Sequence, residues 1–304
     1  MIPRLSTVAV VLSLGGALFA CVPGKDDPVT TTSSDPIAVT KGSPPLALSG
    51  SVRTDFTLNG AVVQGGAVVG RAPSGATAVR FNSELLPLTP DGYFLIGFDR
   101  DAPDRATLTA SLSDGRDLTR TLTVAPGAWR IEHVNTRYTG GAATTAEFER
   151  RRAGELAQIN AARRTSSASE GWRQTFIWPV KGRLSGYFGS QRVYQGKPGS
   201  YHSGTDIAVP TGTPFVAPAD GVVVLAAETP FTLEGRLLIV DHGHGLSSSF
   251  LHCSRLDVKI GDVVRQGQQL GLVGATGRAS GPHLHWAAKW NTARIDTRKL
   301  AGEM

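Results

Sequence analysis

The sequence predicts a mainly β protein in which one long helix separates two regions of short strands. In the first region, residues 107–112 and 120–124 alternate apolar and polar side chains, the period of two that half-buried strands show. In the second, residues 221–225, 236–240 and 270–273 are apolar enough for buried strands, and glycine and proline punctuate the chain between them. We therefore expect a small β-sandwich, a linking helix and a compact, mainly antiparallel β domain at the C-terminus.

Length and composition limit the possible partners. With 304 residues, the chain is long enough for about two domains of ordinary size. Its formal net charge of +6 favours anionic partners such as cell-envelope polymers or carboxylate-bearing peptides. The sequence has no long run of lysine and arginine and no nucleic-acid-binding motif, so we expect no nucleic-acid partner. We expect a monomer, although nothing in the sequence specifies an oligomeric state.

Residues 1–20 have the pattern of an export signal. Arg4 supplies a positive charge, and the apolar stretch 8–19 is too short to span a bilayer as a helix but suits a signal peptide. The segment leads into Leu-Phe-Ala-Cys, which resembles the lipobox of bacterial lipoproteins except for its bulky Phe19. The resemblance implies that Cys21 carries lipid and becomes the first residue of a lipid-anchored protein. The alternative is an ordinary secretory signal followed by an unrelated cysteine.

Composition divides the rest of the chain into four segments. Residues 21–45 are rich in threonine, serine, proline and aspartate, and predict an acyl-cysteine followed by a flexible tether. Residues 46–140 hold the first strands and hairpin turn signals, and predict a β-sandwich module that is immunoglobulin-like in size. Residues 141–173 predict an amphipathic helix and a linker, and residues 174–304 the compact β domain.

The helix itself is expected over residues 145–164. Thr144 and Glu147 have the spacing of a capping box at its start. One face is apolar and carries Phe148, Leu156 and Ile159. The charged residues within 147–152 lie on the opposite face, which we interpret as solvated.

Histidines are concentrated in the C-terminal domain. His283 and His285 lie two apart, so on a strand they project to the same side, with Leu284 turned toward the core. One of two such imidazoles can bind a metal while the other handles protons. His242 and His244 have the same spacing, and spacing alone does not separate the two pairs.

Two further groups complete a candidate site. His202 and Asp206 lie four apart near Gly204 and Pro210, which argue against a helix, so the pair spans a strand start or a turn. His252 lies on a predicted strand. Two imidazoles and one carboxylate form a three-ligand zinc site that leaves the fourth position open for water. Two remaining histidines can transfer protons and stabilise a tetrahedral intermediate.

From residue 176 to the C-terminus the chain resembles the LytM or lysostaphin-type zinc endopeptidases, which cut peptide bridges in the bacterial cell wall. The motifs that carry the resemblance are His-Ser-Gly-Thr-Asp at 202–206, Phe-Leu-His at 250–252 and His-Leu-His at 283–285. They lie in order within supporting runs at 216–222, 241–245 and 273–282. The similar region covers about 130 of the 304 residues.

This resemblance implies a role for each site residue. The implied metal ligands, for one zinc ion, are His202, Asp206 and His285. The implied catalytic pair is His252 and His283, which orient water and stabilise the oxyanion. The resemblance also implies that the other closely spaced pair, His242 and His244, belongs to a loop between strands.

Cys253 takes the place of a residue that is commonly leucine in these enzymes. On a strand it should face away from His252, together with Leu251, so we expect a small buried residue and not a nucleophile. If Cys21 carries lipid, Cys253 has no partner for an intrachain disulfide.

These observations favour a lipid-anchored zinc endopeptidase in which metal-activated water attacks an amide in the peptide cross-links of peptidoglycan. Its partners would be peptidoglycan stem peptides, with a D-alanyl–diaminopimelate bond favoured over polyglycine as the bond that is cut. By resemblance to lipoprotein sorting in some enteric-type bacteria, Val22 after the lipidated position favours an anchor on the periplasmic side of the outer membrane over the inner one. The alternatives are a catalytically silent LytM-like activator of a cell-wall amidase and an envelope-binding scaffold whose metal is structural.

Overall fold

A computed structural model of the protein describes residues 52–137 and 145–304. The predicted signal peptide, Cys21 and the tether lie outside the described residues. The described part is mainly β, which confirms the predicted fold class. Among these residues, no helix is both long enough and apolar enough to cross a membrane.

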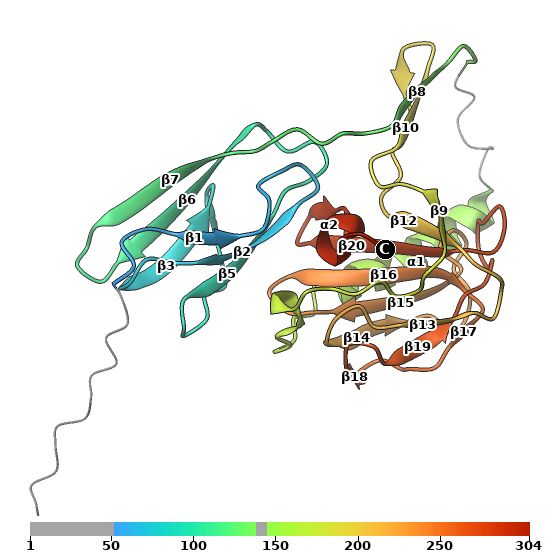
Figure 1. Ribbon diagram of the computed structural model, residues 1–304. Coiled ribbons are helices and arrows are strands. Elements are labelled where there is room, and N and C mark those ends of the chain that lie inside the picture. Colours follow the sequence, from blue (N-terminus) through green and yellow to red (C-terminus); the bar gives the residue numbers. More distant parts are fainter. Residues whose placement is uncertain (1–51, 138–144) are drawn as a thin grey trace, which may run out of the picture. The chain divides into compact units, whose positions relative to one another are not determined.

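The first region contains two antiparallel sheets (Figure 1). One has the strand order β1-β2-β5 and the other β4-β3-β6-β7. The bounds are β1 Thr57–Asn59, β2 Ala67–Arg71, β3 Ala76–Phe81, β4 Glu84–Leu85, β5 Tyr93–Gly97, β6 Arg105–Leu112 and β7 Asp117–Thr123. Between the sheets, Phe81 of β3 meets Phe98, which follows β5, with ring centroids 5.6 Å apart. The turn between β6 and β7 contains Gly115 at φ 85°, as its Asp-Gly turn signal predicts.

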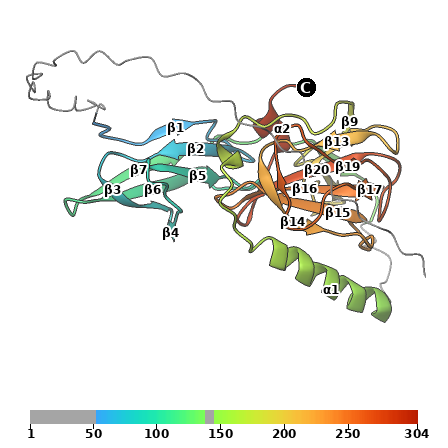
Figure 2. The same ribbon diagram turned by 90° about the horizontal axis from the view of Figure 1, so that it is seen from below.

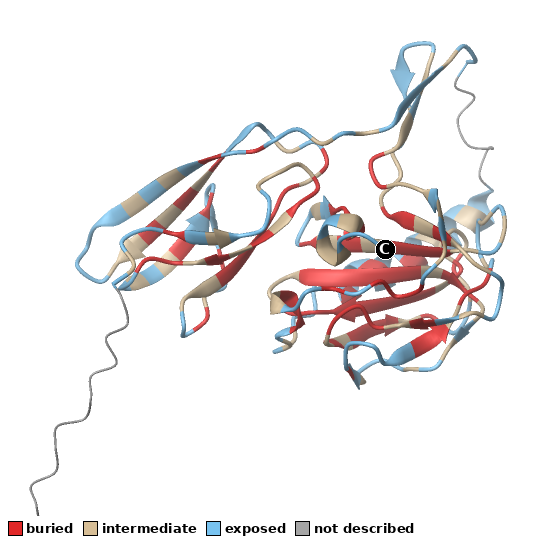
Figure 3. Ribbon diagram, in the orientation of Figure 1, coloured by how far each residue is buried: buried red, intermediate tan, exposed pale blue. Residues whose placement is uncertain are grey.

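The second region is built on one large antiparallel sheet with the order β18-β14-β15-β16-β20-β12-β9, and with β21 paired to β20. Its strands are β9 Arg183–Gly186, β12 Thr205–Ala208, β14 Gly221–Ala226, β15 Arg236–Asp241, β16 Leu246–Cys253, β18 Val263–Val264, β20 Leu284–Trp290 and β21 Ala293–Ile295. A smaller sheet contains β13 Pro214–Val216, β19 Gln269–Leu272 and β17 Arg255–Leu256. The central strands β15, β16 and β20 are the most continuously buried (Figure 3).

One strand of the first region pairs with the second. β8, Ile131–Val134, lies parallel to β10, Gln191–Tyr194, and β10 pairs in turn with β11, Lys197–Pro198. This pairing brings the end of the predicted sandwich segment 46–140 to the segment just before His202. The four-segment division of the chain stays a prediction.

The long helix, α1, spans Ala146–Ala162 and lies along one face of the large sheet (Figure 2). Its N-cap is Thr145, whose hydroxyl accepts a hydrogen bond from the backbone N–H of Phe148 at 3.1 Å. The predicted cap, Thr144, is outside the described residues. Ile159 is buried against strands β14 and β15, whereas Leu156 is 40% exposed. Two short helical segments also occur: the 3-10 turn Gly171–Arg173 and α2, Thr297–Ala301.

The charged residues within 147–152 were expected to form a solvated face, and this expectation is wrong for Arg152, whose side chain is only 15% exposed. Glu155 is buried and accepts hydrogen bonds from the backbone N–H and the hydroxyl of Thr232, at 2.7 and 2.6 Å. Arg152 binds both carboxylate oxygens of Glu234, at 2.6 and 2.8 Å. A buried carboxylate is stable only when its oxygens are paired. Helix α1 is therefore held on the sheet by polar contacts to the loop before β15 as well as by Ile159.

Candidate metal centre

The sheet register brings the three histidine-containing motifs together. In the pairing of β12 with β20, Asp206 lies directly opposite His285. In the pairing of β16 with β20, Leu251 lies opposite His285, which places His252 beside it. His202 precedes β12 and folds back over the same point. Residues separated by about 80 positions in the chain thus meet because three neighbouring strands carry them.

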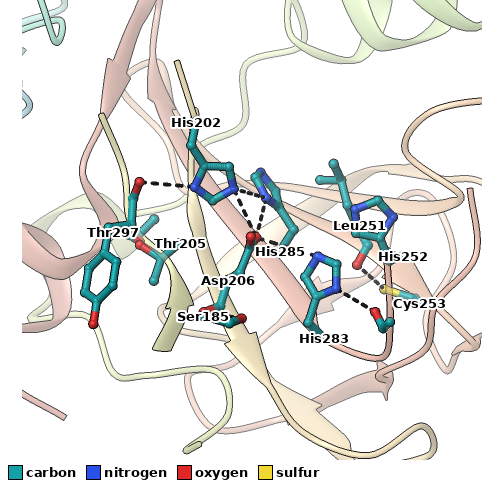
Figure 4. Close-up of polar contacts among 12 residues, drawn as sticks. Ser185, His202, Thr205, Asp206, Leu251, His252, Cys253, His283, His285 and Thr297 are labelled. Carbon is teal, nitrogen blue, oxygen red and sulfur yellow. Dashed lines mark hydrogen bonds and ion pairs between the residues drawn. The ribbon is translucent and has the colours of Figure 1, made fainter. Parts of the chain in front are cut away.

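Three side chains present one ligand atom each to a common point (Figure 4). Asp206 Oδ1 lies 3.1 Å from His202 Nε2 and 2.8 Å from His285 Nδ1, and the two nitrogens are 3.1 Å apart. A tetrahedral zinc ion with bonds of about 2.0–2.1 Å holds its ligand atoms about 3.3 Å apart. The arrangement fits such an ion after shifts of a few tenths of an ångström.

Backbone groups orient this cluster from behind. His202 Nδ1 lies 3.2 Å from the carbonyl oxygen of Tyr187, and because a carbonyl only accepts, Nδ1 carries the proton. Nε2 of His202 is then free to bind a metal, as in many metal sites.

Close packing around the cluster requires glycine at two positions. A β-carbon at Gly204 would lie 2.7 Å from His285 Nε2, and one at Gly186 would lie 2.3 Å from Asp206 Oδ2.

Two more histidines stand beside the cluster. His252 Nδ1 donates to the carbonyl oxygen of Thr276 and His283 Nδ1 to that of Gly281, both at 2.8 Å. The two rings are 4.8 Å apart between centroids, and His283 Nε2 is 3.7 Å from Asp206 Oδ1. Each ring therefore keeps an Nε2 that can accept a proton.

The backbone at His252 is unusual for a residue on a strand. Its φ is +65°, and the register between β15 and β16 shifts at this point. A bulge of this kind redirects the side chains of a strand. Leu251 consequently lines the same cleft as His252, and the prediction that it faces away with Cys253 is wrong. Side chains alternate strictly between the two faces of a strand only where its hydrogen-bond pairing with the neighbouring strand is regular.

The five side chains open into one cleft of about 620 Å³. Beyond them, its walls include Leu233, Glu234, Leu251, Arg278 and Ser280. Of these, Arg278 and Ser280 lie in residues 273–282, a run that supports the resemblance to LytM-type enzymes and so indicated this part of the site. The sequence does not predict that Glu234 lines the cleft, because nothing in its sequence context distinguishes it from a surface carboxylate. The cleft is large enough to admit an extended peptide segment.

The pKa values of the cleft histidines depend on how deeply each ring is buried and on the negative charge of Asp206. Burial opposes the charged form of Asp206, but its polar contacts with His202 and His285, together with the charges of those rings, outweigh burial and lower the pKa of the carboxyl. Burial also opposes charge on His202, yet the hydrogen bond and the negative charge of Asp206 raise its pKa. Burial lowers the pKa values of His285 and His252. The lowered pKa values favour the neutral imidazoles of His285 and His252, and neutral imidazole is the form that binds metals and accepts protons.

His242 and His244 lie in the turn between β15 and β16, away from the cleft. His242 is completely buried, donates from Nδ1 to the carbonyl oxygen of Asp220 at 2.8 Å, and has Nε2 2.9 Å from the Ser248 hydroxyl. The ring of His244 stacks on Trp172, with centroids 4.1 Å apart. His242 and His244 have the same spacing as His283 and His285, but they pack within the protein and do not line the cleft, because this turn folds into the core.

We expect His242 to make the protein sensitive to acid. Burial lowers its pKa to about 4 from an ordinary value of 6.5. Between these pH values the unfolded chain binds the extra proton and the folded chain does not, so folding stability is full above pH 6.5 and falls toward pH 4. The loss amounts to about 3 kcal/mol. Urea unfolding of wild type and His242→Gln at pH 7.5 and 4.5 measures it. Equal losses in both proteins would contradict the assignment, since the other histidines are common to both.

Cys253 is fully buried, as expected. Burial raises the pKa of its thiol to about 12, so the thiolate is scarce at neutral pH. Since only the thiolate is an effective nucleophile, this residue is a packing element of the core.

The fold and the site together are those of a peptidase with a candidate metal centre: an antiparallel β domain gathers two histidines and an aspartate in an open cleft, with two further histidines beside them. Residues 200–297 match the family described as Peptidase family M23. The chain belongs to that family through this domain, and the predicted resemblance is confirmed.

Individual proteins show how far the similarity extends. Peptidoglycan DD-endopeptidase ShyA from Vibrio cholerae is 41% identical over 112 residues, which are 36% of this chain and 26% of ShyA. Cell division protein DipM from Caulobacter vibrioides is 36% identical over 124 residues, 41% of this chain and 19% of DipM. The chain thus matches about a quarter or less of the length of these relatives.

A solved structure extends the similarity beyond the peptidase domain. A crystal structure assigned to peptidase M23 from Pseudomonas aeruginosa has a TM-score of 0.61 at 31% identity. The likeness covers 80% of this chain and 96% of that one.

Proposed function

We propose that this protein is a zinc-dependent endopeptidase that hydrolyses peptide cross-links of bacterial peptidoglycan. The observation that carries the proposal is the convergence of His202, Asp206 and His285 on one point, with His252 and His283 beside them in the same open cleft. The name of ShyA, a peptidoglycan DD-endopeptidase, supports the choice of substrate.

The donor set suits zinc, which binds imidazole nitrogen and carboxylate oxygen in tetrahedral sites. His202 Nε2, Asp206 Oδ1 and His285 Nδ1 would hold the ion, which supplies Lewis acidity toward water and the scissile carbonyl when bound. Three protein ligands leave a position open, a feature of catalytic rather than structural zinc sites.

Proton transfer and stabilisation of the oxyanion are the roles of His252 and His283. With Nδ1 committed to a carbonyl oxygen, each ring accepts a proton at Nε2 and, once protonated, donates from the same atom. One ring can take the proton of the attacking water, and a protonated ring can donate a hydrogen bond to the oxyanion or pass its proton to the leaving amine.

The finer features of the proposal rest on the sequence and on the names of the relatives. The DD-endopeptidase names favour a D-alanyl–diaminopimelate bond over polyglycine. A lipid anchor at Cys21, the outer membrane as its location and a monomeric state remain proposals from the sequence. A lipid anchor in the outer membrane would put the cleft in the cell envelope, where its substrate is found.

Digestion of purified sacculi tests the activity. We expect the zinc-loaded protein to release soluble cross-link fragments, and we expect excess chelator to abolish release and added zinc to restore it, because the ion supplies the Lewis acid. Mass analysis of the new termini identifies the bond. If the zinc-loaded protein releases nothing but stimulates a wall amidase, and still does so after His285→Ala, the activator alternative is correct.

A further inference from the structure

A second cleft adjoins the metal centre and has no role in the mechanism above. It has a volume of about 280 Å³ and lies between α1 and the large sheet. It shares Ser203, Glu234, Leu251 and His285 with the metal cleft, so the two clefts are adjacent. Ser249 and Ala287, which lie opposite each other on β16 and β20, form part of its floor. Small side chains leave room above the floor for a peptide.

Three cations border the end of this cleft that is farther from the metal centre. Lys289 and Arg294 are directly opposed in the pairing of β20 with β21, and Arg163 reaches the cleft from the C-terminal end of α1. Like charges at opposed positions of a sheet destabilise it. Within residues 52–137 and 145–304, none of the three side chains forms an ion pair with a carboxylate.

The nearby acidic groups are already engaged. Glu234 is held by both guanidinium nitrogens of Arg152. Asp99 accepts a hydrogen bond from the backbone N–H of Arg294 at 2.8 Å, while the side chain of Arg294 donates to the hydroxyl of Tyr201. The cations therefore keep hydrogen-bond donors that no carboxylate in the described part of the chain uses.

Desolvation and the charges of neighbouring cations act in the same direction on two of these groups. Partial desolvation, followed by the charge of Arg294, lowers the pKa of Arg163. Desolvation, followed by the charges of Arg163 and Arg294, lowers the pKa of Lys289. A bound anion would offset the repulsion among these cations.

We propose that this second cleft is an extension of the substrate site, in which Arg163, Lys289 and Arg294 bind a carboxylate of the peptide. The proposal rests on the proposed function, because it assumes that a peptide occupies the metal cleft. His285, Ala287 and Lys289 share one face of β20, and four residues of strand span about 13 Å. An extended peptide along β20 would place a carboxylate three to four residues from the scissile bond over these cations.

Binding of a cross-linked muropeptide to the full chain tests this proposal. The protein is purified in detergent and stripped of metal with chelator, so that the ligand is not cut. The probes are a purified dimeric muropeptide and the same muropeptide with its carboxylates converted to amides. We expect Arg163→Gln and Lys289→Gln each to weaken binding of the acidic probe about tenfold, the effect of losing one charge-assisted hydrogen bond. We expect the amidated probe to bind all proteins with similar, weak affinity.

Arg164→Gln is the matched control, because Arg164 is the exposed neighbour of Arg163 and does not line the cleft. It should bind the acidic probe like wild type. A protein that releases peptides from sacculi but whose affinity is unchanged by amidation, Arg163→Gln and Lys289→Gln would refute this inference and leave the proposed function intact. Binding that depends on these cations, without any release from sacculi, would refute the proposed function alone.

Discussion

His285→Ala is expected to abolish tight zinc binding and to lower the rate of cross-link hydrolysis on the order of 10³-fold or more, because the loss of the ion removes the Lewis acid that serves both water and the carbonyl. His285 Nδ1 lies 2.8 Å from Asp206 Oδ1 and 3.1 Å from His202 Nε2, so the substitution removes one of the three ligand atoms. Metal content by mass spectrometry and peptide release from sacculi measure the two effects. Asp206→Asn should act in the same direction, since it removes the one negative charge of the donor set.

His133→Ala is the matched control for this substitution. His133 is an exposed histidine on β8 and does not line the metal cleft. Its removal should leave zinc content and rate unchanged. A His285→Ala protein that folds, retains one zinc ion and digests sacculi at the rate of the control would show that the metal centre is not where we place it.

The second large effect is expected at His252. We predict that His252→Asn lowers kcat by about 10²- to 10⁴-fold, the usual contribution of a positioned acid–base group, while zinc content is retained. Asparagine suits this position because it tolerates the positive φ and can donate to the carbonyl oxygen of Thr276, but it lacks the Nε2 that accepts a proton. Steady-state kinetics on a purified cross-linked muropeptide separate kcat from KM.

Cys253→Ala is the control, because it changes the neighbouring residue without touching the cleft. Its buried thiol has a raised pKa, so we expect kcat to stay within about twofold of wild type, as for a residue that takes no part in proton transfer. If His252→Asn retains wild-type kcat while Cys253→Ala does not, the roles assigned to these two adjacent residues are incorrect.

Much of the candidate site can be predicted from the sequence because its signals are local. A period of two indicates strands whatever they pair with, and His283 and His285 share a face as a consequence of that period alone. The resemblance then selects His202, Asp206 and His252 from a chain that contains only seven histidines. Local pattern was also enough to place one long helix between the two β regions.

Where the patterns misled, the cause was a contact with a distant segment. Alternation put Leu251 on the face away from His252, but pairing with β15 introduces a bulge that turns both toward the cleft. The charged residues within 147–152 were interpreted as solvated, yet Arg152 is largely buried and binds Glu234. The bulge in β16 and the burial on α1 each depend on a second segment of the chain, so neither can be predicted from local sequence.

By itself, then, the sequence determined the β class, the long helix and the identity of the five residues proposed for the site. Only the tertiary structure decided which atoms of those residues face one another, that His242 belongs to the core, and that Arg163 and Lys289 border one cleft. The physical reason is that side-chain periodicity is set by the local backbone, whereas register, burial and the meeting of charges depend on strands and helices far apart in the chain.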